Sequence, residues 1–149
     1  MNEHPSRSTV QKDAETELVK MLGQKLKCVL EPHEIKLNKK SSIQIDGFSD
    51  KDRILCEVYT HIGTLRGGQP DKIAADILKL NLAEKRKGGQ WRKILLFADD
   101  LACKQLKGSS WLAEACKESQ IVIEVAEASK EIMEKISAAQ QRQRMVNAG

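Results

Sequence analysis

Apolar residues recur along the chain at two spacings, one typical of helices and the other of strands. At intervals of three and four residues they predict helices over residues 9–27, 70–86 and 129–145, and another over 99–119 that breaks near Gly108. Alternation, or a short continuous apolar run, predicts strands over residues 34–38, 42–46, 54–62, 93–98 and 121–125. A polar segment, residues 1–8, precedes the first helix.

The order of these elements favours one domain of the α/β class. Antiparallel strands come first and strands alternate with helices afterwards, which predicts a mixed central sheet with an antiparallel meander, flanked by helices. A chain of 149 residues can bury such a core without a second domain. We therefore expect a flexible leader at residues 1–8, a single domain over 9–145 and a C-terminal tail at 146–149.

Charge and residue types limit the functions that fit this chain. Its net charge of +4 permits attraction to nucleic acid, whereas two Trp, two Phe and one Tyr are too few for an aromatic stacking platform. Four separated cysteines form no CxxC pair, which indicates neither a zinc site nor disulfides. The chain has no apolar leader and no run of about 18 apolar residues, which predicts a cytoplasmic protein without a membrane span.

Two carboxylates stand on consecutive predicted strands that form a hairpin. Asp46 ends the first strand, and Glu57 lies in the middle of the second, on the same face as Tyr59. Two carboxylates on adjacent strands can hold Mg²⁺ or Mn²⁺ together with waters and phosphate oxygens. The alternative is that Asp46 and Gly47 begin an ordinary hairpin turn and that Glu57 is a solvated residue on an exposed face.

The pattern Ile-Asp46-Gly, hairpin, Glu57-Val-Tyr59 resembles the signature of the PD-(D/E)xK nuclease-like superfamily. The resemblance covers roughly residues 9–126, because the family shares the order helix, three-strand meander, crossover helix and strand. It implies a restriction-endonuclease-like fold and metal-dependent hydrolysis of DNA or RNA phosphodiesters, with Asp46 and Glu57 as catalytic and metal-binding acids. The signature ends in Lys, and Tyr59 holds that position here. A tyrosine cannot supply the positive charge that this lysine brings to the reaction.

Two lysines of the helix predicted over residues 70–86 are candidates for that charge, because in some members of the superfamily the lysine has moved to the following helix. Lys72 follows the glycine-rich loop and is the first candidate for a relocated catalytic lysine. Lys79 lies two turns along the same polar stripe and is the second. The alternative is that both lysines belong to a solvated face around Asp76.

Three further positions are candidates to assist this site. The resemblance implies a supporting acid on the first helix that reaches the metal through a water, and Glu17 is the first choice, with Glu15 competing. The alternative for Glu17 is a surface acid favoured by the helix dipole. Gln69 is a candidate to donate a hydrogen bond to substrate or water, and Arg66 to contact phosphates. Both could equally be solvated loop residues.

These observations lead to three hypotheses. The first is a metal-dependent nuclease that uses Mg²⁺ or Mn²⁺ on DNA or RNA and obtains its specificity from a homodimer partner or a second protein. The second, favoured by Tyr59, is a catalytically silent nuclease-like scaffold that binds nucleic acid or a protein partner. The third is a plain α/β domain whose acids are structural. It stays open because a fold alone does not define a function.

Overall fold

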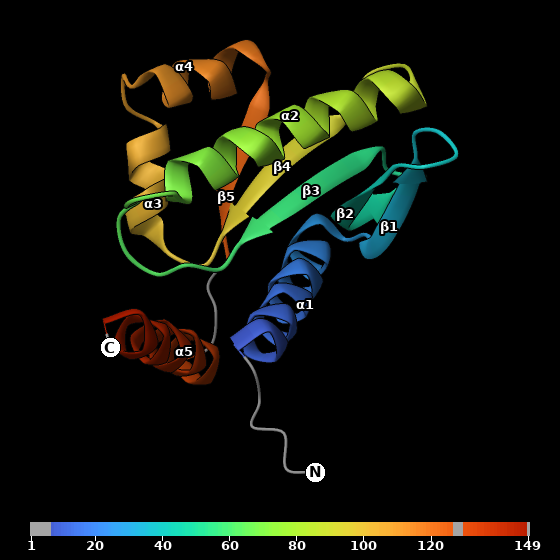
Figure 1. The fold of residues 1–149 in the computed structure, drawn as a ribbon. Helices are drawn as coiled ribbons and strands as arrows, with labels where there is room; N and C mark the ends of the chain where they lie inside the picture. The colour runs from blue at the N-terminus through green and yellow to red at the C-terminus, as the bar shows by residue number, and fades with distance from the viewer. Residues whose placement is uncertain (1–6, 127–129, 149) are drawn as a thin grey trace.

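In the described part of the chain five strands form a single open sheet, in which neighbours in space are also neighbours in sequence (Figure 1). The computed structural model describes residues 7–126 and 130–148. The strands are β1 (Glu31–Lys36), β2 (Ser42–Ser49), β3 (Ile54–Tyr59), β4 (Arg92–Phe97) and β5 (Ile121–Val125). The first three pair as an antiparallel meander, whereas β4 and β5 run parallel to β3. The α/β class and the mixed sheet predicted from the sequence are therefore confirmed.

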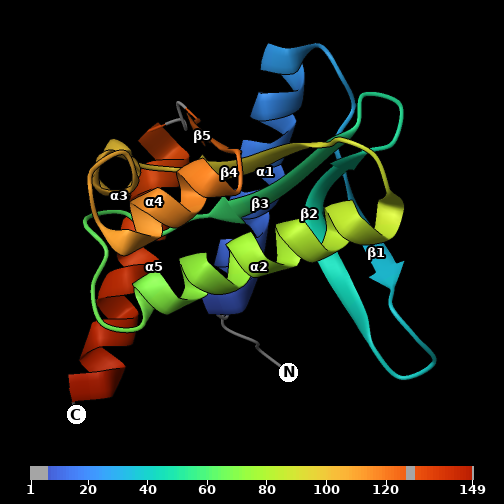
Figure 2. The same ribbon diagram turned by 90° about the horizontal axis from the view of Figure 1, so that it is seen from above.

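Helices cover both faces of this sheet and give the molecule three layers (Figures 1 and 2). One face carries α1 (Arg7–Leu26) and α5 (Lys130–Ala148). The other carries α2 (Gln69–Lys87), α3 (Asp100–Leu106) and α4 (Trp111–Glu118). The parallel strands are joined by helical crossovers, α2 between β3 and β4, and α3 with α4 between β4 and β5, as parallel pairing requires.

The observed bounds differ from the predicted ones at the ends of the chain and in the first three strands, where β2 runs on to Ser49 past the predicted end at Asp46 and β3 ends at Tyr59, before the predicted end at Ile62. α1 begins at Arg7, within the segment predicted as a leader, and residues 1–6 lie outside the described part. α5 extends to Ala148, past the helix end predicted near residue 145, while its predicted start at Ser129 and residue 149 lie outside the described part. β1 begins at Glu31 and includes Pro32, which an edge strand tolerates because one row of its backbone groups is unpaired.

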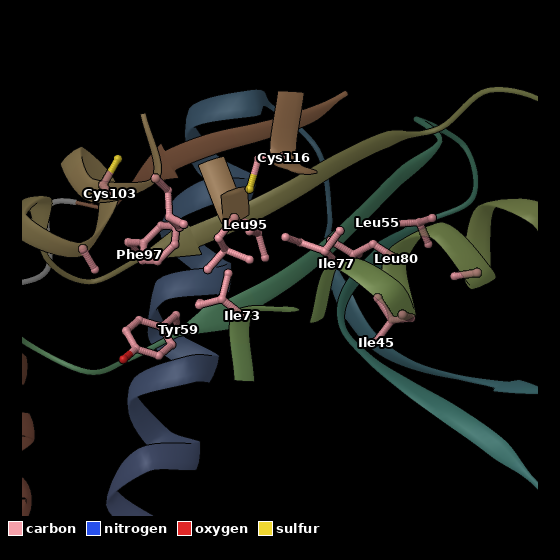
Figure 3. Packing of buried hydrophobic residues seen from close by; sticks show 14 of the residues in the cluster. Ile45, Leu55, Tyr59, Ile73, Ile77, Leu80, Leu95, Phe97, Cys103 and Cys116 are labelled. Atoms are coloured by element: carbon pink, nitrogen blue, oxygen red, sulfur yellow. The ribbon is translucent and has the colours of Figure 1, made fainter. Parts of the chain in front are cut away.

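Each face of the sheet carries one hydrophobic cluster, and β3 contributes to both. Leu55 and Tyr59 belong to the cluster beneath α2, where Figure 3 shows them beside side chains of that helix. Cys56 and Val58 belong to the opposite cluster, which α1 and α5 cover. All six residues of β3 are buried. The strand therefore carries Glu57 into the interior of the protein along with its apolar neighbours.

The structure also describes the state of the cysteines and the character of the helices, on which the expectations about disulfides and a membrane span depend. All four cysteines are free thiols, and Cys56, Cys103 and Cys116 are buried among core residues. In residues 7–126 and 130–148, no helix combines the length and the apolar character that a membrane span needs.

Candidate functional site

A β-bulge in β2 sets the position of Asp46. Pairing with β1 slips by one residue here, so that Asp46 and Gly47 together oppose the single residue Pro32. Ile45 and Phe48 consequently both pack toward α2, although residues three apart in a regular strand face opposite sides. β2 continues beyond the bulge, so Asp46 and Gly47 lie within the strand and do not begin the hairpin turn.

The carboxylate of Asp46 is held against the neighbouring strand. The β2–β3 ladder stops at the pair Gly47–Cys56 and does not include Asp46, the residue of β2 that precedes Gly47. Beyond that point the backbone N–H of Val58 donates to Asp46 Oδ2 at 2.9 Å. A buried N–H group needs an acceptor, and this carboxylate supplies it where the ladder of strand carbonyls has stopped. Asp46 is thereby fixed at the place where β2 leaves β3.

Glu57 is buried beside Asp46, with 1% of its surface exposed. Burial, followed by a hydrogen bond to the Asp46 carboxyl and the negative charge of that carboxyl, raises the pKa of Glu57 from 4.5 to about 9, against the opposing effect of Lys79. At neutral pH Glu57 therefore keeps its proton and donates a hydrogen bond to the Asp46 carboxylate. The interpretation of Glu57 as a solvated surface residue is wrong, because β3 lies between two other strands and under α2.

Lys79 brings a positive charge to this carboxyl pair from α2. Its Nζ lies 2.8 Å from Glu57 Oε1 and donates to the backbone carbonyl of Gln44 at 3.0 Å. This contact brings the ammonium against the Glu57 carboxyl group, and Oε1 makes no directed hydrogen bond among the described residues. Burial acts to lower the pKa of Lys79, but the neighbouring acids outweigh it and raise that pKa, so the ammonium stays charged.

Lys72 and Asp76 form a second pair nearer the start of the same helix. Lys72 Nζ lies 3.2 Å from Asp76 Oδ2. Asp76 is 4% exposed, and burial raises the pKa of its carboxyl, while Lys72 and Lys79 act to lower it. The Lys72 side chain is 47% exposed, against 28% for Lys79. The two lysines therefore do not form a solvated face around Asp76, because Asp76 is in the interior and Lys79 reaches Glu57.

α1 contributes Glu15 to this group and not Glu17. Burial raises the pKa of Glu15 and the charge of Asp46 raises it next, while a hydrogen bond donated by Gln11 at 3.3 Å and the charge of Lys72 lower it. Glu15 thus lies within the electrostatic field of the site. Glu17 is exposed and follows two residues later, about 200° around the helix, so the structure does not bring it to the other acids.

Tyr59 occupies the position of the missing lysine but belongs to the core. It is 2% exposed, and its ring packs against Phe97 and His61 with centroids 5.6 and 5.9 Å apart. Burial raises the pKa of its hydroxyl to about 12, and this hydroxyl has no hydrogen-bond partner among the described residues. In Figure 3 the hydroxyl points away from the packed side chains. The positive charge beside Glu57 comes from Lys79 on α2.

Gln69 and Arg66 close the loop that leads into α2. The side-chain Oε1 of Gln69 accepts from the backbone N–H of Arg66 at 2.9 Å, and the backbone N–H of Gln69 donates to the Arg66 carbonyl at 2.9 Å. The Arg66 side chain is exposed. Gln69 therefore shapes the N-terminal end of the helix that carries Lys72, and neither residue makes a described contact with Asp46 or Glu57.

Asp76 is the member of this group to which sequence reasoning gave no role, although its position carries a signal. Ile73, Ile77 and Leu80 are buried on one face of α2 at helical spacing, and Asp76 falls three residues after the first of them. An acid on the core-facing side of a helix is costly unless it is paired. Helical spacing alone therefore distinguishes Asp76 from the exposed acids of the chain.

The donor set fits a divalent cation at Asp46 and Glu57. A carboxyl pair that shares one proton, with Glu57 buried and Asp46 half-buried, offers oxygen atoms to a cation that replaces the proton, and Mg²⁺ commonly takes one or two protein carboxylates together with waters. No group of three or more His, Cys, Asp or Glu in the described part of the chain is arranged to hold a metal ion. Any cation here would therefore rely on this pair, with Glu15 nearby.

Comparison with known proteins adds no relative from which a function could be transferred. The chain matches no protein-family model, and neither the curated proteins nor the solved structures give a significant match. The basis for assigning a function is therefore the chemistry of the site residues themselves.

Proposed function

We propose that this protein is a metal-dependent nuclease that hydrolyses phosphodiester bonds of DNA or RNA. The observation that carries the proposal is the proton-sharing pair of the half-buried Asp46 and the buried Glu57, which lies where β2 leaves β3 and is faced by Lys79. Similarity in motif and element order to the PD-(D/E)xK superfamily supports the same function. Membership of that superfamily and a cytoplasmic location are parts of the proposal.

In this proposal Asp46 and Glu57 hold Mg²⁺ or Mn²⁺, which when bound activates water and withdraws charge from the phosphate oxygens. The hydrogen bond from Val58 N–H keeps Asp46 in place, which limits the reorganisation needed when substrate arrives. Lys79 holds its ammonium beside Glu57, where it stabilises negative charge that develops on the phosphate. Lys72, more exposed and paired with Asp76, is available to contact the substrate.

A groove beside the carboxyl pair supports nucleic acid as the substrate. It has a volume of about 850 Å³ between α1 and the β1–β2 hairpin, and Glu15 and Asp46 stand in its wall. Three exposed lysines, Lys12, Lys20 and Lys27, line it at intervals of about two helical turns. Regularly spaced ammonium groups along a groove favour a phosphate backbone, and this groove leads it to the acids. Arg66 and Gln69 remain candidates for further contacts on the α2 side.

Cleavage of labelled single- and double-stranded DNA and RNA with Mg²⁺ and Mn²⁺ tests the proposal. We expect Asp46→Asn and Glu57→Gln to abolish cleavage because each removes a ligand of the metal ion, and Lys79→Met to lower the rate about 100-fold because it removes positive charge near the phosphate. Glu17→Gln is the matched control, since it changes an exposed acid of α1 outside the group. Cleavage that survives both Asp46→Asn and Glu57→Gln contradicts the site.

A catalytically silent scaffold is the second candidate function, and one observation favours it. The proton of Glu57 and the ammonium of Lys79 already compensate the carboxyl pair without a cation. A scaffold of this kind would bind nucleic acid or a protein partner and gain no stability from Mg²⁺. A metal site should instead raise the melting temperature, and more at about pH 8.5 than at about pH 6, because the cation must displace a proton. No cleavage and no rise at either pH would establish the scaffold.

A further inference from the structure

A second, smaller cavity is lined by Lys72, which also pairs with Asp76 of the site group. Its volume is about 140 Å³, and it is an open pocket lined by residues of α1, the end of β3 and the residues after it, the start of α2 and α5. We call it the α1–α5 pocket. Its apolar wall is formed by Val10, Ile136 and Ala139. Its polar wall includes Gln11, Tyr59, His61 and Lys72.

The Tyr59 hydroxyl marks this pocket as a binding site. Tyr59 lines the pocket, its side chain is 2% exposed, and its buried hydroxyl has no hydrogen-bond partner among the described residues. A buried hydroxyl without a partner costs free energy that a ligand accepting its hydrogen bond would recover. Lys72 Nζ, 3.2 Å from Asp76, supplies a second donor at the same wall. Tyr59 and Lys72 therefore bring two donor groups to the wall of this pocket.

The size and lining of the pocket define the ligand. A cavity of roughly 150 Å³ with apolar walls accommodates one benzene-sized ring, so this pocket of about 140 Å³ matches a single six-membered ring. A purine carries a second ring and exceeds that size. A phosphate group fits the chemistry less well, because its double charge would meet apolar side chains and the acids Glu15 and Asp76 close to Lys72. A ring with carbonyl oxygens on its edge satisfies both donors.

We propose that the α1–α5 pocket holds a pyrimidine base of the nucleic-acid substrate, with Tyr59 and Lys72 donating to its carbonyl oxygens. The inference rests on the proposed nuclease function and adds a substrate preference to it. Lys72 links the two sites, since it lines the pocket while its charge acts on Glu15 beside Asp46. A nucleotide with its phosphate at the carboxyl pair would place a neighbouring base in the pocket, unstacked from the strand.

Binding of free nucleosides to the intact protein, followed by NMR without metal, tests this pocket independently of cleavage. The probes are thymidine, cytidine and adenosine, with inorganic phosphate as a separate titrant. We expect thymidine to bind at least tenfold more tightly than adenosine. Tyr59→Phe, which removes only the hydroxyl, should weaken thymidine binding about fivefold through the lost hydrogen bond.

Filling the pocket is the second arm of the experiment. Ala139 is buried and lines the pocket, so Ala139→Leu should fill it and weaken thymidine binding at least tenfold. The neighbouring Ala138 is exposed on the same helix, and Ala138→Leu is the matched control that should bind as the wild type does. If Ala139→Leu does not fold, the thymidine affinity of Tyr59→Phe alone tests the proposal.

Several results would overturn the proposal. They are an absence of thymidine binding at millimolar concentration, adenosine binding as tight as thymidine binding, and thymidine affinity unchanged by Tyr59→Phe. Phosphate binding that is lost in Tyr59→Phe would assign the pocket to a phosphate group instead. Because these measurements need no cleavage, they stand when Asp46→Asn and Glu57→Gln variants still cleave. In the same way, failure of the pocket leaves the carboxyl site untouched.

Discussion

Single residues in the site are held in charge states that their surroundings impose. Glu57 keeps its proton because the side chain is buried and because Asp46 accepts a hydrogen bond from the protonated carboxyl group. Lys79 keeps its charge because three acids surround it, Glu57, Asp76 and Asp46. A group whose protonation depends on the folded environment makes the stability of the fold depend on pH. Measurements of stability therefore report the charge states of the site.

The proton on Glu57 should make the metal-free protein less stable as pH rises. The folded pKa of Glu57, about 9, exceeds the ordinary value of 4.5, so the stabilisation is complete below about pH 4.5 and is lost progressively up to about pH 9. The slope for one proton cannot exceed about 1.4 kcal/mol per pH unit. Urea unfolding with a chelator between about pH 6 and pH 9 measures it. Glu57→Gln should flatten the profile, and Glu17→Gln should not; equal profiles for wild type and Glu57→Gln would contradict the buried proton.

The two lysines of α2 should differ in their effect on stability. Lys72→Met leaves the buried Asp76 carboxyl without the lysine that pairs with it and should lower the free energy of unfolding by about 1–3 kcal/mol. Lys79→Met should cost less than about 1 kcal/mol near neutral pH, because Glu57 keeps its own proton and is left without an uncompensated charge. Chemical denaturation of both variants near neutral pH gives the comparison. A larger loss for Lys79→Met would contradict the proton on Glu57.

At the scale of elements, the bulge in β2 connects backbone packing with the position of Asp46. Gly47 lies in the bulge, and a Cβ there would stand 3.2 Å from a methyl group of Val19 and 3.3 Å from the Cβ of Cys56. α1 and β3 therefore approach β2 closely beside Asp46 because residue 47 has no side chain. Overpacking of a core position of this kind costs about 1–3 kcal/mol.

Gly47→Ala should accordingly lower the stability of the fold by about 1–2 kcal/mol and weaken the response to Mg²⁺. The added methyl group pushes β2 away from α1 and moves Asp46, the adjacent residue, relative to Glu57. Thermal unfolding with and without Mg²⁺ measures both effects. Gly68→Ala is the control, because a Cβ at Gly68 meets no atom within 4 Å and its φ of −80° suits alanine. If Gly47→Ala matched Gly68→Ala, the bulge would not constrain the site.

Periodicity was sufficient to predict the elements, because helices and strands that form a core repeat their apolar residues at fixed intervals. It could not predict the bulge, since Asp46-Gly47 is also a common turn sequence and only pairing with Pro32 shows the extra residue. It could not predict which of the two lysines contacts Glu57. Lys72 and Lys79 share one stripe of α2, and only the folded sheet places Glu57 opposite Lys79. The sequence could have favoured Glu15 over Glu17, because Glu15 precedes Val19 by one helical turn on the buried side of α1.

At the scale of the whole molecule, three layers bring α1, the β2–β3 opening and α2 to one place. Glu15 comes from the helix on one face of the sheet, while Lys72, Asp76 and Lys79 come from the helix on the other. Helices on opposite faces can meet in this way because β2 leaves β3 at Asp46 and the sheet is open there. The large groove starts at this opening and follows α1, which gives a substrate strand a path to the acids.

The lysines along that path should set how nucleic-acid binding depends on salt. Each lysine that contacts a phosphate adds about 0.7–0.9 to the slope of log affinity against log salt concentration, because it releases condensed counterions. Lys20→Ala and Lys27→Ala should each reduce the slope by that amount and weaken binding to different sequences about equally. Fluorescence anisotropy between about 50 and 200 mM salt, with Ca²⁺ in place of Mg²⁺ to prevent cleavage, provides the measurement. Lys104→Ala is the control, since Lys104 is an exposed lysine of α3, away from the groove. If Lys104→Ala lowered the slope as much as Lys20→Ala, binding would depend on net charge alone and the groove would not be the path of the strand.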